Sequence, residues 1–413
     1  MIRSVSRLVL VGLLVWSAGT TVFVRSAVAA ADAAVWVATW GAPPDQAGPA
    51  LKQQTIRQVI QTSVRGSKLR VRLSNLYGAG PVTIGPVRVA KSAGGSAIQA
   101  GTDRAVTFAG KPSVTIPKGG DVLSDPVTFH AGALDALAIS LYLPSPVEAS
   151  TIHGVAMQTA FIVAGDSTTA EKLPAGETDT SRYFLTDVDV EAGADARTFV
   201  IVGDSVTDGV GSSEDKNARW PDALAARLQR DPALKSIAVI NSGIAGNRIL
   251  NDAADPFIGP STLSRFDRDA LSKPGVRWVL LLQGINDISA SSVLTDPKQK
   301  VSAEQIIEGM KTLIARARAR KIQIWAGTLL PRKGVQAPFN SPENEVKRRA
   351  VNAWIRSSGA FDAVIDFEKA VQDPADPDRQ LPRFDSGDHR HPNDAGYKAM
   401  ADALDLTLFT KQR

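Results

Sequence analysis

The chain has 413 residues, more than one ordinary domain needs, and 44% of them are hydrophobic, which is typical of a globular protein with a large core. The net charge is +5, but Arg3, Arg7 and Arg25 lie in an N-terminal segment without acidic residues. The remainder is therefore nearly neutral, and no nucleic acid partner is expected. The sequence contains no cysteine, which excludes disulfides, thiolate catalysis and cysteine-ligated metals.

Residues 1–29 predict a secretory signal peptide. Arg3 and Arg7 form its basic start, residues 8–15 form its apolar run, and Ala27-Val28-Ala29 provides the small side chains that a signal peptidase requires. An uncleaved membrane anchor is the alternative, because residues 8–24 are about long enough to span a bilayer. The cleavage site favours an exported protein, periplasmic or extracellular, with no stable membrane insertion after signal cleavage.

Residues 35–190 predict a β-rich accessory domain with a linker. Polar and apolar side chains alternate along residues 68–73 and 136–143, and this period of two puts alternate residues on one buried face of a sheet. Clusters of turn residues separate such runs, which favours an all-β sandwich or a jelly-roll-like fold. Residues 166–197 are more polar and predict a connection, in which the segment around Phe184 could form one further strand.

Residues 198–410 predict an α/β domain, because short apolar runs alternate there with helical patterns. Strands are expected at residues 198–202, 237–240, 278–282, 322–330 and 364–367, and helices from residue 220, over 306–317, over 346–355 and over 397–406. Apolar strands separated by helices form a parallel sheet that is covered on both faces. Ligands bind beyond the carboxyl ends of such strands, so functional residues should follow the apolar runs.

A hydrolase without cysteine commonly uses a histidine as its base, and the sequence has four: His130, His153, His389 and His391. Asp388 precedes His391 by three residues and can bind its ring from the same turn, as the aspartate of a catalytic triad does. Two alternatives remain for this segment. It could be a solvated loop ahead of a helix, or His389 and His391 could bind a metal ion. Because no matching ligand cluster occurs elsewhere, we expect no metal.

Two segments have the sequence Gly-Asp-Ser, and their contexts distinguish them. Ser205 follows the apolar run that ends at Val202 and precedes a helical pattern, which places its Oγ at the ligand-binding edge and leaves its backbone N–H free to donate. A polar stretch follows Ser167, and we expect a turn there. Neither segment matches G-x-S-x-G, which argues against an α/β-hydrolase nucleophile elbow. Asp204 and Asp208 are expected to have capping and turn roles.

Loops after the next two strands could provide an oxyanion hole. A glycine within residues 241–247 would let the backbone approach a substrate, and the Asn286 side-chain amide could donate to a developing negative charge. Glycine and asparagine are also ordinary turn residues, so neither loop is decisive alone. Three consecutive strand ends that carry Ser, Gly and Asn, together with an Asp/His loop, form a coherent acyl-transfer site.

These motifs resemble those of the SGNH hydrolase superfamily, also called GDSL esterases and lipases. Four blocks occur in the family order over about residues 198–410: Gly203-Asp204-Ser205 with Asp208-Gly209, Gly246, Gly284-x-Asn286-Asp287, and Asp388-x-x-His391-Pro392. The resemblance implies a flavodoxin-like three-layer α/β/α domain without a cofactor. It also implies that Ser205 is the nucleophile, His391 the general base and Asp388 its orienting partner. The oxyanion would be held by the N–H groups of Ser205 and Gly246 and by the Asn286 side chain.

The whole chain is also similar to a bacterial secreted subgroup of this superfamily, in which a β-rich domain precedes the hydrolase domain. This broader similarity depends on the layout and on Arg72-Leu73-Ser74-Asn75 and Gly246-Asn247-Arg248. We therefore expect an exported serine esterase that hydrolyses carboxylic esters through a Ser-His-Asp triad. Its substrate would be a small-molecule or glycan ester.

Carbohydrate deacetylation is the favoured reaction, because an accessory β domain in an exported protein suggests contact with glycans. Trp36, Trp40 and Tyr77 could stack on sugars, although aromatic residues near strands belong more often to the core. One alternative is a lipase-like acylhydrolase that acts on longer acyl chains. The other is a non-catalytic carbohydrate-binding surface protein, which would require the loss of a catalytic residue.

Overall fold

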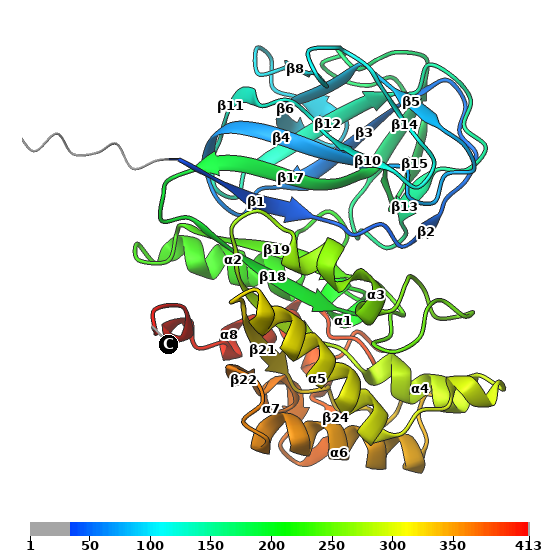
Figure 1. The fold of residues 1–413 in the computed structure, drawn as a ribbon, viewed down its shortest axis with the longest axis vertical. Helices are drawn as coiled ribbons and strands as arrows, with labels where there is room; N and C mark the ends of the chain where they lie inside the picture. Colours follow the sequence, from blue (N-terminus) through cyan, green and yellow to red (C-terminus); the bar gives the residue numbers. More distant parts are fainter. Residues whose placement is uncertain (1–33, 412–413) are drawn as a thin grey trace, which may run out of the picture. The chain divides into compact units, whose positions relative to one another are not determined.

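The computed structural model describes residues 34–411, and the predicted signal peptide lies outside these residues. They belong to one compact unit, in which an antiparallel β-rich region is followed by a parallel α/β region (Figure 1). The predicted fold class is therefore confirmed.

Two antiparallel sheets make up most of the β-rich region. The first has the order β1 (Val35–Gly41), β17 (Leu185–Ala192), β4 (Gly66–Ser74) and β10 (Asp121–Leu123), and β11 (Val127–Ala131) also pairs with β4. The second has the order β15 (Glu177–Asp179), β14 (Ala160–Ala164), β3 (Gln54–Gln61), β12 (Ala136–Tyr142), β6 (Val87–Gly94) and β7 (Ala97–Ile98), and β8 (Arg104–Val106) also pairs with β6. Two smaller sheets complete this region. In one, β13 (Thr151–His153) pairs with β2 (Gln46–Ala47) and β16 (Arg182–Tyr183); in the other, β5 (Val82–Ile84) pairs with β9 (Val114–Ile116).

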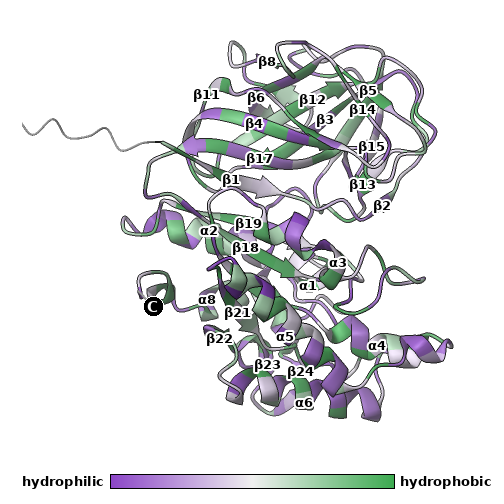
Figure 2. Ribbon diagram, viewed as in Figure 1, coloured by the Kyte–Doolittle hydropathy of each residue, from purple (hydrophilic) through white to green (hydrophobic). Residues whose placement is uncertain are grey.

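One hydrophobic core is shared by the two large sheets. Along β4 the predicted alternation is present, because Leu69, Val71 and Leu73 are buried in this core while the residues between them are partly exposed. Ile56 on β3 and Ile139 on β12 belong to the same core. Figure 2 shows hydrophilic and hydrophobic residues mixed along β4 and β17, as expected for strands whose two faces have different surroundings.

The prediction of a polar connection over residues 166–197 is wrong in its last part. Residues 185–192 form β17, which lies between β1 and β4 in the first sheet. Val188 and Val190 point into the core, while Asp187 and Asp189 are buried on the opposite face. Asp189 pairs with Arg70 at 2.9 Å, and Asp187 pairs with Lys273. The acidic residues therefore belong to ion pairs of a central strand and do not mark a solvated linker.

The α/β region contains a five-stranded parallel sheet. Its order is β19 (Ile237–Gly243), β18 (Arg197–Gly203), β20 (Val276–Leu282), β21 (Gln323–Gly327) and β22 (Ala363–Ile365). Numbered along the chain this order is 2-1-3-4-5, the flavodoxin-like order, and its switch point lies between β18 and β20. The strand predicted at residues 364–367 is shorter, because Asp366 caps a helix that begins at Phe367.

Helices cover both faces of this sheet, as Figure 1 shows. One face carries α3 (Thr262–Phe266), the π-helical turn η1 (Asp267–Leu271), α4 (Ile285–Val293), α5 (Ala303–Ala319) and α6 (Pro342–Ser357). The other carries α2 (Trp220–Arg230), α7 (Phe367–Val371) and α8 (Asp394–Ala403). The remaining elements are α1 (Ser205–Asp208), η2 (Pro297–Gln299), η3 (Pro382–Phe384), η4 (Leu406–Phe409), β23 (Gln372–Asp373) and β24 (Asp376–Gln380). Among residues 34–411, every helix is too short or too polar to cross a lipid bilayer.

The β-rich region contacts the edge of the parallel sheet at its end strand, β19. The N–H of Val239 donates to Oγ of Ser63 at 3.0 Å, and the N–H of Ala38 donates to the carbonyl of Pro274 at 3.1 Å. β1 approaches so closely that a Cβ on Gly41 would lie 2.7 Å from Cγ2 of Ile240. Polar and apolar contacts thus join the two regions along this edge.

Candidate active site

Ser205 lies where β18 ends and the single-turn helix α1 begins. Asp204 is the N-cap of α1, and its Oδ1 accepts the N–H of Val206 at 3.1 Å. The predicted capping role of Asp204 is therefore confirmed. Burial raises the pKa of Asp204 to about 7, although the hydrogen bond from Val206 lowers it. The turn requires glycine at position 203, because a Cβ there would lie 2.1 Å from Oγ1 of Thr207.

His391 and Asp388 belong to the loop that precedes α8. This loop is distant from Ser205 in the sequence but lies beside it in the structure. The Nε2 atom of His391 lies 2.8 Å from Oγ of Ser205, and its Nδ1 atom lies 2.5 Å from Oδ2 of Asp388. His391 is buried, Ser205 is partly buried, and the Asp388 side chain is 43% exposed. The structure thus brings together the three residues that the sequence predicts as a triad.

The surroundings of Asp388 keep its carboxylate charged. Its Oδ1 accepts the N–H groups of Arg390 and His391, both at 2.8 Å, and the hydroxyl of Ser386 at 3.1 Å. Burial alone would raise the pKa of Asp388, but the hydrogen bonds from His391 and Arg390, and the positive charge that His391 carries when protonated, hold it well below its usual value. An ionised Asp388 accepts the Nδ1–H of His391, so the lone pair of Nε2 faces the hydroxyl of Ser205.

His389, the alternative base, has a different partner. Its Nδ1 lies 2.5 Å from Oδ2 of Asp385, and its side chain is 53% exposed. Its backbone is left-handed, with φ of 58°, and its ring packs beside Gly334, where a Cβ would lie 2.9 Å from Cγ of His389. The loop therefore contains two separate Asp–His pairs, and the pair that contains His391 is the one that contacts Ser205.

The residues predicted for the oxyanion hole follow three adjacent strands. Ser205 is the first residue of α1, so its N–H has no partner inside that helix. Gly246 is a central residue of a turn closed by the N–H of Asn247 and the carbonyl of Ile244 at 3.1 Å, and its φ of 73° favours glycine. Asn286, in the first turn of α4, is 5% exposed.

The loops of Gly246 and Asn286 are joined directly. Nδ2 of Asn286 donates to the carbonyl of Asn247 at 3.1 Å, which leaves a second N–H on the same amide. Asp287 accepts the N–H groups of Ile249 and Leu250 at 2.8 and 3.0 Å. The start of α4 therefore fixes the loop that carries Gly246.

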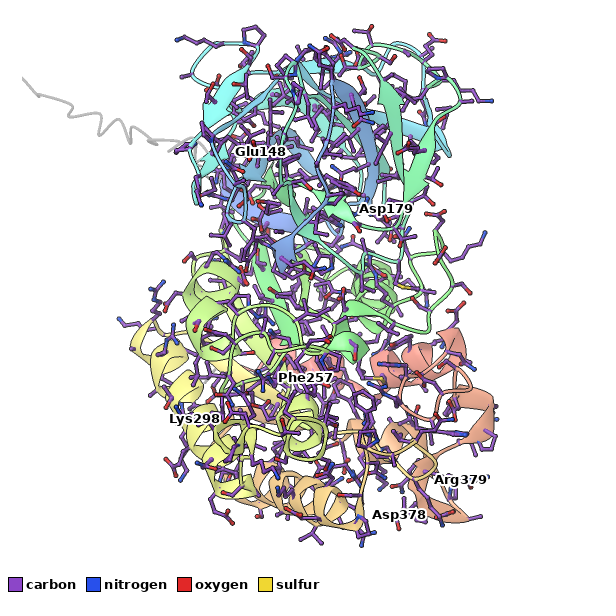
Figure 3. All side chains as sticks on the ribbon, turned by 90° about the vertical axis from the view of Figure 1, so that its right-hand side faces the viewer. Glu148, Asp179, Phe257, Lys298, Asp378 and Arg379 are labelled. Carbon is purple, nitrogen blue, oxygen red and sulfur yellow. The ribbon has the colours of Figure 1, made fainter. Side chains whose placement is uncertain are left out.

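Phe257, labelled in Figure 3, lies in a neighbouring segment that packs against Gly246. A Cβ on Gly246 would come 3.5 Å from its Cα and 3.3 Å from the backbone N of Ile258. The approach to Ile258 is slightly tight and that to Phe257 is ordinary contact, so the positive φ of Gly246 is the main reason for glycine at this position.

A buried hydrogen-bond network around Asn247, which the sequence does not predict, supports the loop that carries Gly246 (the oxyanion loop). Oδ1 of Asn247 accepts Nε of Arg265 at 3.0 Å and Nε2 of Gln283 at 3.1 Å. Arg265 is fully buried and also donates to the carbonyls of Gly203 and Ser242, at 3.1 and 3.0 Å. Arg265 thus ties the ends of β18 and β19 together. Asn247 belongs to Gly246-Asn247-Arg248, one of the segments that carry the broader similarity, but its sequence context does not indicate this buried role.

Asp208 has more than the local role that the sequence predicts. Its Oδ2 accepts the N–H of Ala245 at 2.8 Å, and its Oδ1 lies 2.9 Å from Nε2 of His153 on β13. Both contacts are distant in the chain, and His153 belongs to the β-rich region. A capping or turn role is therefore too narrow a description of Asp208, because it connects three segments around the site.

Ser167 lies outside this arrangement, in the turn that the sequence predicts. Asp166 accepts the N–H of Thr168 at 3.0 Å and its hydroxyl at 2.7 Å, and residues 165–170 form bends and turns without a helix. Trp40, one of the aromatic residues considered for sugar stacking, is buried in the core of the β-rich region. In the part of the chain that the structure describes, no three histidines or acidic residues are grouped to hold a metal ion.

Comparison with known proteins supplies a family for the α/β region. Residues 201–399 match the model of the GDSL-like lipase/acylhydrolase family. No curated protein matches the chain. Similar solved structures include a protein described as lipolytic and of the G-D-S-L family from Desulfitobacterium hafniense, at 24% identity, covering 50% of this chain and 96% of that chain, with a TM-score of 0.37.

Two other solved structures show the same kind of likeness. A GDSL-like lipase from Bacteroides thetaiotaomicron is 17% identical over 52% of this chain and 88% of that chain, with a TM-score of 0.36. The acetylxylan esterase Axe2 from Geobacillus stearothermophilus is 19% identical over 52% of this chain and 95% of that chain, with a TM-score of 0.38. The match of residues 201–399 to the GDSL-like lipase/acylhydrolase family model confirms the family that the motifs predict for this region.

Proposed function

We propose that the protein is an exported serine esterase that hydrolyses carboxylic esters through an acyl-enzyme on Ser205. The observation that carries the proposal is the continuous chain from Oγ of Ser205 to Nε2 of His391 and from Nδ1 of His391 to Asp388, at 2.8 and 2.5 Å. A nucleophile within reach of a base, and a base oriented by a carboxylate, is the arrangement that activates a serine hydroxyl.

The chemistry then proceeds in two halves. As Oγ of Ser205 attacks the ester carbonyl, its proton moves to Nε2 of His391, and the carbonyl oxygen becomes an oxyanion. The N–H groups of Ser205 and Gly246 and the remaining amide N–H of Asn286 stabilise this charge. The alcohol leaves with the proton from His391, and a water molecule, activated by the same ring, releases the acid from Ser205.

We propose acetylated carbohydrate as the substrate class. The support is the β-rich region that accompanies the α/β region in a chain whose N-terminal sequence predicts export. The small cavity lined by Asp204 and Val206 is not lined by Ser205 or His391, so it does not define the acyl group.

Export remains a proposal that depends on residues 1–29. Its basic start, apolar run and Ala27-Val28-Ala29 support cleavage by a signal peptidase. Fractionation of the producing cell, with mass measurement of the mature N-terminus, tests it. Recovery of the uncleaved chain in the membrane fraction would instead support an anchor.

The function is tested by rates across acyl chain lengths. Hydrolysis of p-nitrophenyl esters from acetate to long-chain acids, and of acetylated oligosaccharides, is measured for the full chain and for Ser205→Ala and Ser167→Ala. We expect a preference for acetyl esters, abolished by Ser205→Ala and retained by Ser167→Ala. A preference for long chains would favour a lipase-like acylhydrolase, and binding of glycans without hydrolysis would favour a carbohydrate-binding protein.

A further inference from the structure

His153 is a buried histidine of the β-rich region that contacts the nucleophile turn. It is the last residue of β13 and is 4% exposed. Its ring lies between the segment that follows β1, which contains Pro43 and Asp45, and Asp208 at the end of α1. It is therefore a direct link from the β-rich region to the helix that begins at Ser205.

Both ring nitrogens of His153 face hydrogen-bond acceptors. Nδ1 lies 2.9 Å from the carbonyl oxygen of Pro43 and 3.5 Å from Oδ2 of Asp45. Nε2 lies 2.9 Å from Oδ1 of Asp208 and 3.1 Å from the carbonyl oxygen of Val155. Because a carbonyl oxygen can only accept, each nitrogen must carry a proton to satisfy these contacts, and the ring is then an imidazolium cation.

The charges around the ring agree with this protonation state. Burial lowers the pKa of His153, but Asp208 and Asp45 raise it, with a net rise to about 9. Three cations face this group of side chains: Arg182 and Arg219 line the small cavity beside His153, and the charge of Arg265 acts on both Asp45 and Asp208. A buried cation between two carboxylates is stable only while both partners stay in place.

Asp208 connects His153 to the loop that carries Gly246. One of its carboxylate oxygens contacts His153, and the other accepts the N–H of Ala245, the residue before Gly246. Asp208 is also the last residue of α1, whose first residue is Ser205. A shift of the Asp208 carboxylate would therefore move the nucleophile turn and the Gly246 turn together.

We propose that His153 is a positioning residue: as an imidazolium held by the β-rich region, it fixes Asp208 and so aligns Ser205 with the N–H of Gly246. This inference rests on the proposed function, because the alignment matters only for an attacking Ser205. It makes the β-rich region part of the catalytic apparatus. A displacement of about 1 Å in such a site is enough to lower the rate about 10²-fold.

The experiment compares His153→Gln and His153→Ala with His130→Ala in the full chain. His130 is an exposed histidine of β11 in the same region and serves as the matched control. The measurements are kcat and KM for p-nitrophenyl acetate, the rate at which a fluorophosphonate labels Ser205, and the midpoint of thermal unfolding. We expect both His153 variants to lose about 10- to 100-fold in kcat and in labelling rate, with KM changed less than about twofold.

Further variants separate positioning from a general loss of structure. If His153 acts through Asp208, the double variant His153→Gln/Asp208→Asn should be no slower than the worse single variant. Activity is expressed per labelled Ser205, so a smaller folded fraction does not count as slower chemistry. A wild-type kcat in a folded His153→Gln protein would overturn the positioning role, and so would additive losses in the double variant.

Asp45→Asn provides a second test if the His153 variants do not fold. If neither His153 variant folds, Asp45→Asn replaces them, because it removes one of the two charges that hold the imidazolium and leaves the ring in place. Its kcat should then fall with rising pH earlier than that of the wild type, and an unchanged profile would overturn the proposal. A wild-type chain that neither hydrolyses esters nor reacts with the fluorophosphonate would overturn the proposed function and this inference together.

Discussion

His389 and His391 lie two residues apart in one loop, yet their rings are bound by different carboxylates, Asp385 and Asp388. The ring held by Asp388 is the one that lies 2.8 Å from Oγ of Ser205. Loss of a triad base removes the proton acceptor, so His391→Ala should lower kcat by about 10⁴-fold or more, whereas His389→Ala should keep kcat within a few-fold of wild type. Steady-state kinetics on an acetyl ester checks both, and an inactive His389→Ala with an active His391→Ala would reverse the assignment.

Replacing Asp388 by asparagine should test whether the carboxylate is needed to orient the His391 ring. The Asp388 carboxylate fixes the tautomer of His391, and an amide in its place can present N–H to Nδ1 and favour the wrong tautomer. We expect kcat to fall by up to about 10⁴-fold with little change in KM. Because the pKa of Asp388 is held well below its usual value, the carboxylate stays ionised on the acid side of the profile. A wild-type kcat for Asp388→Asn would mean that the aspartate is dispensable.

Gly211→Ala should disturb the active site by a purely steric route. Gly211 has φ of 90°, and a Cβ on it would lie 2.8 Å from the carbonyl oxygen of Pro392 and 3.2 Å from Cβ of His391. We expect the His391 loop to move and kcat to fall by about 10²-fold. Gly165→Ala is the matched control, since Gly165 also has a positive φ but no atom lies within 4 Å of its Cβ position. It should lose stability without losing kcat; equal kinetic effects of the two variants would contradict the steric argument.

Asn286→Ala tests the predicted oxyanion donor. Removal of one preorganised donor typically costs about 10²- to 10³-fold in kcat, so a loss of that size with a nearly unchanged KM is expected. Because the Asn286 amide also binds the carbonyl of Asn247, the thermal midpoint should be recorded on the same samples. A folded variant with wild-type kcat would remove Asn286 from the oxyanion hole.

The buried charge on His153 predicts how stability depends on pH. Its folded pKa is raised from 6.5 to about 9, so the unfolded chain loses this proton first as the pH rises. The resulting stabilisation is fully present below about pH 6.5 and is lost as the pH approaches 9. The thermal midpoint of the wild type should therefore fall between these values more steeply than that of His153→Gln, while His130→Ala should keep the wild-type slope. Equal slopes for wild type and His153→Gln would show that His153 carries no such charge.

Short-range patterns allowed much of the site to be predicted. Ser205 follows a strand directly, and Asp388 and His391 share one turn, so periodicity and spacing made them candidates, and the resemblance to SGNH hydrolases implied their roles. The contact between His153 and Asp208 spans 55 residues and two regions of different architecture, and no sequence pattern links its two members. It depends on how the β-rich region packs against the sheet, which local propensity does not specify.

The error at β17 has a different cause. Residues 187–190 alternate between polar and apolar, but both polar positions are aspartates, which usually indicate solvent-exposed chain, and Thr186 and Asp187 interrupt the alternation. In the structure Asp187 and Asp189 are buried against basic partners, so the acidic character reflects ion pairing inside a sheet. The further strand expected around Phe184 therefore begins at Leu185 and extends to Ala192, where Arg70 and Lys273 balance its aspartates.

The hydrogen bond from Val239 to Ser63 bears on whether the α/β region can be produced without the β-rich region. β19 is the end strand of the parallel sheet, and the open backbone of an end strand is a template on which another chain can add a strand. Ser63 and β1 cover part of that backbone in the intact protein. We expect an α/β region produced alone to expose the backbone of β19 and to self-associate. The β-rich region would then limit aggregation as well as support the site.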